Sequence, residues 1–192
     1  MTFLGTCSPV LDDLLKDQDE VLDTQTALKH MSRETLRWRI KSGRWQQPCR
    51  GIVVAHSGPL TQRQRLWVAT LWGGSGAALA GLTAARLSGL RGFDRDQEAI
   101  HLLRPVSRKV RASAPPLDLV VHYSGRLGEA DVHPVLRPAR TRIDRSLIDA
   151  AVWMVTDRGA QAILAAGVQQ RLVRVGDLCA WSKRTRNCPG AR

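Results

Sequence analysis

Three basic side chains recur at four-residue spacing in the segment 32–43. Arg33, Arg37 and Lys41 fall along one edge of this segment if it is helical, because residues four apart are neighbours on a helix surface. Arginine and lysine donate hydrogen bonds and carry positive charge, so such an edge can contact phosphate oxygens or the acceptor atoms of bases. Trp38 falls on the same outward side. The spacing therefore predicts a surface that binds a polyanion.

The distribution of charge supports this prediction. Residues 1–30 contain six acidic and two basic side chains, whereas residues 31–50 contain six basic side chains and one acid, Glu34. A solvated surface would mix the two signs, so the step gives this part of the chain an orientation. The whole chain has a net charge of +12, which favours nucleic acid first and anionic membrane second as partners.

The amino terminus has neither the basic start nor the apolar run of a signal peptide. No window reaches the roughly 18 consecutive apolar residues that a membrane span needs. We therefore expect a cytoplasmic protein that does not enter a membrane.

The elements that must position the basic edge can be predicted from local signals. Apolar spacing predicts short helices over 9–16 and 24–31, and Asp23 is a plausible N-cap of the second. Ser32 caps a third helix, and Gly43 ends it because glycine tolerates the left-handed conformation found there. These signals predict three short helices in a row.

A β-hairpin should follow the third helix. Ile52 to Val54 have high strand propensity, and a Pro-Cys-Arg-Gly turn precedes them. Arg44 and Arg50 would then meet phosphates from this hairpin. Three helices and a hairpin predict a winged helix-turn-helix DNA-binding domain over residues 1–57. Its expected DNA-binding residues are Arg33, Arg37, Trp38, Lys41, Arg44 and Arg50.

Residues 58–181 are predicted to form a small mixed α/β domain, so the fold class is α+β. A basic connection joins two strands of this domain, and its basic residues are Arg104, Arg108, Lys109 and Arg111. We interpret this connection as the solvated tip of a hairpin. The alternative that it forms a second contact with nucleic acid stays open. The expected strands are 99–103, 117–123 and 134–136, and the expected helices are 61–74, 83–90, 142–156, 158–167 and 175–181. Residues 182–192 are basic and unperiodic, and we expect a disordered tail there.

Residue types that support catalysis or metal binding do not cluster in the sequence. His101 and His122 can face each other across adjacent strands, but no third metal ligand accompanies them. Phosphate-loop, metalloprotease and serine-hydrolase motifs are absent, and no strand carries the acidic pair and lysine of a nuclease. We therefore expect no catalytic residue, cofactor or metal. The scattered cysteines are expected to be free thiols: Cys7, Cys49, Cys179 and Cys188.

Longer runs of the sequence resemble a known family. The runs SGRWQQPCRGIVV and LTAARLSGLRGFD are the most distinctive, and PARTRIDRSLIDAA and AAGVQQRLV extend the likeness over about residues 20–180. In these runs the chain resembles the AbiEi-type antitoxin-like transcriptional regulators of type IV toxin-antitoxin systems. Two features depart from the family pattern: His30 replaces a frequent turn glycine, and the ending KRTRNCPGAR differs from the usual basic helix.

The resemblance implies a repressor that binds operator DNA and autoregulates its operon. It also implies opposition to a nucleotidyltransferase toxin without a stable complex, and DNA binding as a possible homodimer. Many such chains continue into a nuclease-like domain of the very-short-patch-repair type, and no nuclease residue can be carried over to this sequence. The alternative is a non-catalytic remnant of such a fusion, or an accessory protein whose positive charge attracts polyanions without specificity.

Overall fold

The structure is a computed structural model that describes residues 9–93, 99–106 and 118–186 of the 192-residue chain. The protein has an α+β fold, as expected. Its described residues form two compact units, one ending at Ser75 and the other beginning at Gly76. None of the described helices combines the length and apolar character that crossing a bilayer needs.

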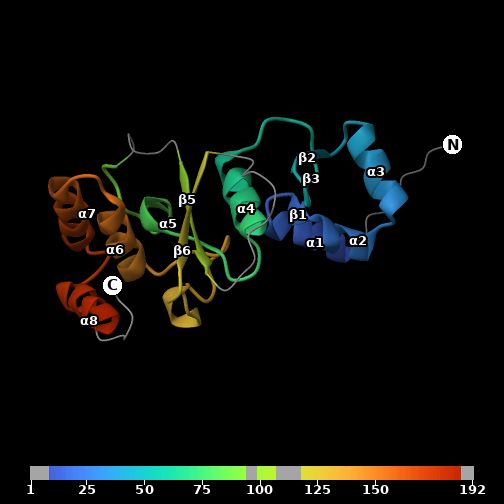
Figure 1. The fold of residues 1–192 in the computed structure, drawn as a ribbon. Helices are drawn as coiled ribbons and strands as arrows, with labels where there is room; N and C mark the ends of the chain where they lie inside the picture. The colour runs from blue at the N-terminus through green and yellow to red at the C-terminus, as the bar shows by residue number, and fades with distance from the viewer. Residues whose placement is uncertain (1–8, 94–98, 107–117, 187–192) are drawn as a thin grey trace. The chain divides into compact units, whose positions relative to one another are not determined.

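The first unit combines short helices with a three-stranded antiparallel sheet of order β1-β3-β2 (Figure 1). Its elements in chain order are α1 (Pro9–Asp17), β1 (Val21–Asp23), α2 (Thr24–His30), α3 (Arg33–Lys41), β2 (Gln46–Cys49), β3 (Ile52–Val54) and α4 (Gln62–Gly73). The three predicted helices and the hairpin are confirmed. The sequence reading missed β1, whose Val21 and Leu22 are fully buried.

Side-chain caps begin α2 and α3 at the predicted residues. Asp23 Oδ1 accepts a hydrogen bond from Thr26 N at 2.9 Å, and Ser32 Oγ accepts one from Thr35 N at 3.1 Å. Each bond satisfies a backbone donor that the first helical turn leaves without a partner. Gly43 follows α3 with a φ of 71°, so the predicted stop is confirmed as well.

The core of the first unit lies under the inner face of α3. Leu36 and Trp45 are 4% and 6% exposed and pack in one cluster with buried residues of α1, the sheet and α2: Leu11, Leu22, Val53 and Ala27. A large buried side chain contributes about 1.5–3 kcal/mol through its removal from water. The inner face therefore holds α3 while the outer face stays in solvent.

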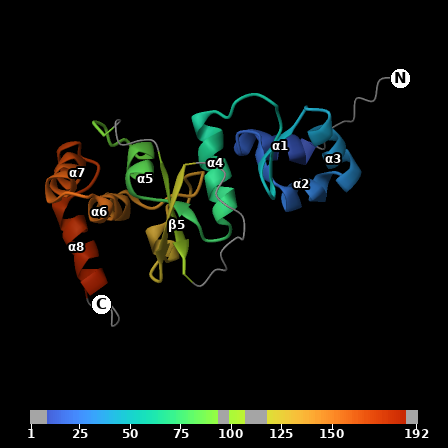
Figure 2. The same ribbon diagram turned by 45° about the horizontal axis from the view of Figure 1, so that its top comes forward.

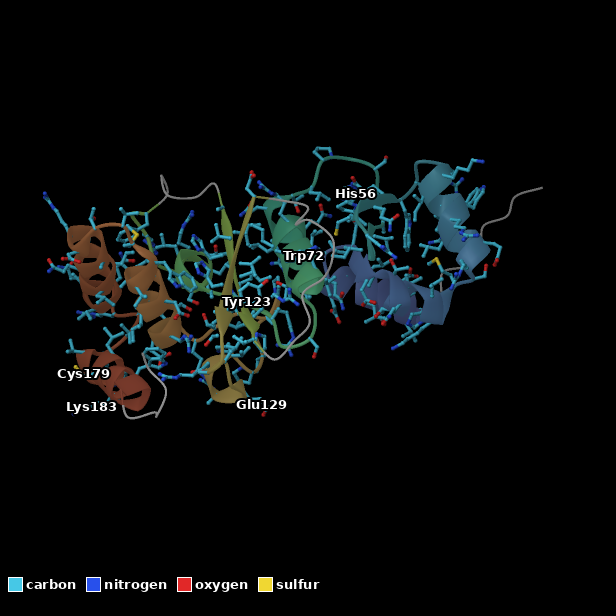
Figure 3. The ribbon with its side chains drawn as sticks, viewed as in Figure 1. His56, Trp72, Tyr123, Glu129, Cys179 and Lys183 are labelled. Carbon is cyan, nitrogen blue, oxygen red and sulfur yellow. The ribbon has the colours of Figure 1, made fainter. Side chains whose placement is uncertain are left out.

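The first unit also includes α4, which the sequence reading assigned to the second domain. Trp67 Nε1 in α4 donates to Asp19 Oδ2 at 2.9 Å, and Gln64 Nε2 donates to Asp19 O at 3.1 Å. His56, labelled in Figure 3, joins the hairpin to α4 because its Nε2 lies 3.0 Å from Gln64 Oε1. This network carries the compact unit past the expected boundary at residue 57, as far as Ser75.

The second unit packs helices against a sheet that contains β5 (Figure 2). The strand order of this sheet is β4-β5-β6. Its elements are β4 (Ala78–Leu79), α5 (Gly81–Leu87), β5 (Ile100–Pro105), β6 (Leu119–Ser124), the 3-10 helix η2 (Glu129–Asp131), α6 (Ile143–Trp153), α7 (Asp157–Gln169) and α8 (Val175–Arg186). Leu82 of α5, Leu147 of α6 and Ile163 of α7 meet in its core. The mixed α/β architecture expected here is consistent with these elements.

The predicted hairpin between the expected strands 99–103 and 117–123 is wrong, because the strands found there, β5 and β6, pair in parallel. Arg104 belongs to β5 and is only 2% exposed, so it is not part of an exposed tip. The remaining basic residues of the connection, Arg108, Lys109 and Arg111, lie outside the described residues. An apolar run of strand length has the same pattern in both pairing directions, so the pattern could not distinguish them.

Two smaller predictions for the second unit are also wrong. Residues 134–136 form no strand, and the third strand of this sheet is instead β4, which pairs with β5. The expected tail from residue 182 begins inside α8, which continues to Arg186. Trp181 in α8 is buried, and Arg145 of α6 stacks on its ring at 4.8 Å, which explains why the helix docks. Residues 187–192 lie outside the described part of the chain.

Candidate nucleic-acid interface

The outer face of α3 carries four of the six residues predicted to bind DNA. Arg33, Arg37, Trp38 and Lys41 are all exposed, and the exposed fraction of Trp38 is 53%. This follows from the helical period, since Leu36 faces the core and its neighbours in sequence are turned away from it. The structure therefore brings these four side chains to one solvent-facing surface.

Arg44 joins this surface from the chain beyond the end of α3. Its guanidinium carbon lies 4.7 Å from the centre of the Trp38 ring, in a cation-π contact. Such a contact at an exposed site contributes about 0.5–1 kcal/mol and limits the rotamers of both side chains. The contact was not predicted, although the six-residue spacing of a tryptophan and an arginine around a glycine stop is visible in the sequence.

A second arginine–tryptophan contact lies between α3 and the core of the unit. Arg39 lies over the ring of Trp45 at 5.0 Å, and Trp45 is buried in the core. The carbonyl of Arg39 accepts hydrogen bonds from Arg44 N at 3.1 Å, from Trp45 N at 3.0 Å and from Ser42 Oγ at 3.2 Å. These bonds fix the path of the chain from α3 to the hairpin. Sequence reasoning did not single out Trp45.

The last predicted residue, Arg50, lies in the turn of the β2–β3 hairpin. Gln46 pairs with Val54 and Cys49 with Ile52, which leaves Arg50 and Gly51 as the turn. Gly51 has a φ of 87°, a conformation that favours glycine and allows this tight connection. Arg50 is exposed. Arg50 therefore lies at the turn of the hairpin, which belongs to the same unit as α3 but is separate from that helix.

One acidic side chain interrupts the positive surface. Glu34 lies in the first turn of α3, and the pKa of its carboxyl is lowered by hydrogen bonds to its own backbone and to Ser32, with smaller effects from Arg37 and Arg33. A carboxylate in the first helical turn interacts favourably with the helix dipole. It also repels phosphate, and among base atoms it can accept only from donors such as cytosine N4. The surface therefore combines positively charged hydrogen-bond donors with one negatively charged acceptor, the Glu34 carboxylate.

Titratable groups of the second unit form an ion-pair cluster that stabilises helix packing. Arg145 Nε donates to Asp149 Oδ2 at 2.8 Å, and Arg145 Nη1 lies 3.7 Å from Asp131 Oδ2. Burial raises the pKa of the Asp149 carboxyl, although the adjacent arginine opposes this effect. Within residues 9–93, 99–106 and 118–186, no three His, Cys, Asp or Glu side chains gather as a metal site requires.

The thiols expected to be free can be followed only in part. Cys49 and Cys179 form no disulfide within the described part of the chain. Cys7 and Cys188 lie outside the described residues.

No protein-family model matches this chain, and no curated protein matches it.

Proposed function

We propose that the first unit is a winged helix-turn-helix domain that binds double-stranded DNA through α3. A helix, a strand, two helices and an antiparallel hairpin, with β1 beside β3, follow one another in the order typical of this fold. The observation that carries the proposal is the exposed basic edge of α3, formed by Arg33, Arg37 and Lys41 beside the Arg44–Trp38 stack. The DNA major groove is wide enough to admit an α-helix, and a helix inserted there would present such an edge to the bases and phosphates.

The proposed contacts follow from the position of each side chain. Arg33, Arg37 and Lys41 contact base edges or phosphates in the groove, because an inserted helix presents its outer edge to both. Arg44, which lies between α3 and the hairpin, and Arg50, which lies in the hairpin turn, contact phosphates. Trp38 packs on the sugar-phosphate backbone and holds Arg44 in place.

The biological role that we propose is repression of the chain's own operon by an AbiEi-type antitoxin in the cytoplasm. The support for this role is the resemblance of the runs SGRWQQPCRGIVV and LTAARLSGLRGFD to that family. The role includes a nucleotidyltransferase toxin as a functional opponent without a stable complex, and a homodimer on an inverted repeat. A neighbouring reading frame that encodes such an enzyme would add support.

The test begins with selection of bound fragments from genomic DNA at physiological salt, followed by fluorescence anisotropy on the selected duplex. Combined Arg37→Ala and Lys41→Ala changes should weaken binding by about 30-fold or more, since each base contact contributes roughly 1–3 kcal/mol. The slope of log affinity against log salt should become shallower by up to about two for this variant. The matched control is Arg158→Ala with Lys183→Ala, which removes the same charge from exposed positions of the second unit.

Two outcomes would overturn the proposal. Equal losses in the two double variants would show that only net charge matters. Equal affinity for random duplex, RNA and heparin would favour the alternative of an accessory protein or fusion remnant with non-specific polyanion attraction.

A further inference from the structure

A cavity of about 400 Å³ lies in the second unit where α5, β5 and the end of α6 meet. Its walls are largely apolar and include Leu82, Ala150 and Met154. His101 and Thr156 supply polar groups, and none of the lining residues is charged. A concave, mostly apolar space of this size with few polar groups is typical of small-molecule sites.

The histidine in this cavity belongs to a pair. His101 Nδ1 and His122 Nε2 are 3.1 Å apart, while the ring centres are 5.3 Å apart and the ring planes differ by 12°. The two distances differ by about the width of one imidazole ring, so both nitrogens lie between the ring centres. This in-line arrangement is that of an N–H···N hydrogen bond. Two ligands of one metal ion would instead aim at a point beside the line that joins them.

Both rings of this histidine pair are neutral near pH 7. Burial lowers the pKa of His101, and burial together with the nearby His101 lowers the pKa of His122 to about 4. In a neutral pair, one of the two facing nitrogens donates and the other accepts. The tautomer of His101 then decides whether its remaining nitrogen, Nε2, is a donor or an acceptor. Among the described residues, no group forms a hydrogen bond with His101 Nε2.

Trp153 holds the pair in place. Its ring stacks on His122 with ring centres 3.3 Å apart and planes within 1°. Gly81 allows this position, because a Cβ atom there would lie 2.5 Å from Trp153 Cζ3, and the glycine φ of 56° also disfavours other residues. The polar group of the cavity is therefore oriented before any ligand arrives, which lowers the entropic cost of binding.

We propose that this cavity binds a small, uncharged, largely apolar molecule whose single hydrogen-bonding group pairs with His101 Nε2. An ionised ligand would lose its hydration and find no opposite charge on the lining residues, so it is disfavoured. A neutral ligand can either donate to or accept from Nε2, since the hydrogen bond to His122 can reverse its direction. This site is independent of the proposed DNA-binding surface.

Phenol and toluene provide the test, because they have nearly the same shape and differ by a hydroxyl in place of a methyl group. The dissociation constants of both are measured by NMR titration on the full chain and on His101→Phe. In the unmutated chain, phenol should bind more tightly than toluene because only phenol forms a hydrogen bond with His101. In His101→Phe this preference, measured as the dissociation constant of toluene divided by that of phenol, should fall by about three- to tenfold, as expected for the loss of one hydrogen bond. His30→Phe, the same change in the first unit, should leave the ratio unchanged.

A second measurement uses the unmutated chain, so the test survives if His101→Phe does not fold. The ring nitrogens of His101 and His122 are followed by ¹⁵N chemical shift during each titration. Phenol should shift the nitrogens of both rings, whereas toluene should leave them almost unchanged, because only phenol can bias the tautomer. Failure of both probes to bind up to their solubility limits, or equal shifts with both, would overturn the proposal.

Discussion

The outer face of α3 and the cavity of the second unit present their polar groups in opposite ways. On α3, Arg33, Arg37 and Lys41 keep their charges in water, and Leu36 on the opposite face anchors the helix. In the cavity, His101 is neutral and half-buried, and the residues that orient it also belong to the packing of the unit. The first arrangement separates the proposed DNA-binding residues from the core of their unit, whereas the second combines the proposed ligand-binding residue with the packing of its unit.

This difference predicts how far substitutions can be tolerated in each region. An exposed side chain on α3 can be removed without leaving a cavity or an unsatisfied buried group. Gly81 beside Trp153 and Gly167 beside Leu147 cannot be enlarged without displacing these side chains, because an added Cβ atom would lie 2.5 Å from each. The following substitutions test this separation, in order of decreasing expected effect.

Trp45→Ala should have the largest effect. It removes a buried ring from the core of the first unit and also removes the support of Arg39. We expect a loss of about 3–5 kcal/mol in the free energy of unfolding, as for other large aromatic truncations. Amide hydrogen exchange in α3 and β3 would measure the loss separately from the second unit. Unchanged protection in these two elements would contradict the proposed anchoring.

Gly167→Ala tests packing in the second unit. A Cβ atom at this α7 position would lie 2.5 Å from Leu147 Cδ1, and Leu147 is fully buried. Overpacking should reduce the free energy of unfolding by about 1–3 kcal/mol, although alanine is the better helix former. Denaturant titration would measure the change. Gly176→Ala in α8 is the matched control; it meets no atom within 4 Å and should be neutral or slightly stabilising.

Acidification should weaken the second unit through the histidine pair. His122 has a pKa of about 4 in the folded chain against 6.5 for an ordinary histidine, so the unfolded chain gains its proton first. The contribution of neutral His122 to the free energy of unfolding is therefore complete above pH 6.5 and is lost as the pH falls toward 4. Because this half-exposed ring is screened by solvent, we expect a loss on the order of 1 kcal/mol.

The measurement is denaturant unfolding of the parent chain and of His122→Gln across this range. Burial raises the pKa of Asp149, so acidification changes the free energy of unfolding through this group in the opposite direction. Asp149 is present in both proteins, so the difference between their pH profiles isolates the contribution of His122. A parallel decline in the two proteins would refute the assignment to His122.

Trp38→Ala should have the smallest effect on stability and completes the comparison with Trp45. The ring is 53% exposed and contacts Arg44, so we expect the free energy of unfolding to fall by no more than about 0.5–1 kcal/mol, which is the contribution of that contact. Affinity for the selected DNA should fall about two- to fivefold as Arg44 loses its support. A stability loss approaching that of Trp45→Ala would show that α3 does not separate binding from folding.

Local signals predicted most of the first unit. The caps at Asp23 and Ser32 and the stop at Gly43 depend on hydrogen bonds within a few residues, so the sequence contains the whole interaction. The exposure of Arg33, Arg37 and Lys41 followed from helical periodicity alone. The strand β1 was missed because three residues carry no readable period, and it is defined only by its pairing with β3.

Long-range pairing accounts for the remaining differences. The parallel pairing of β5 with β6, the hydrogen bond of Trp67 in α4 with Asp19 and the in-line bond of His101 with His122 all join residues that are distant in sequence. The sequence indicated that the two histidines could meet. It could not show that the rings would form a neutral hydrogen-bonded pair, because this depends on the register of parallel strands and on Trp153.

The carbonyl of Arg39 has a consequence for protein engineering. It receives three hydrogen bonds that set the exit from α3, and none of them involves a side chain of the outer face. The positions 33, 37 and 41 can therefore be randomised as a set while the path into the hairpin stays constant. In a library of variants at these positions, the fraction of members that fold would measure how independent the outer face of α3 is from its buried face.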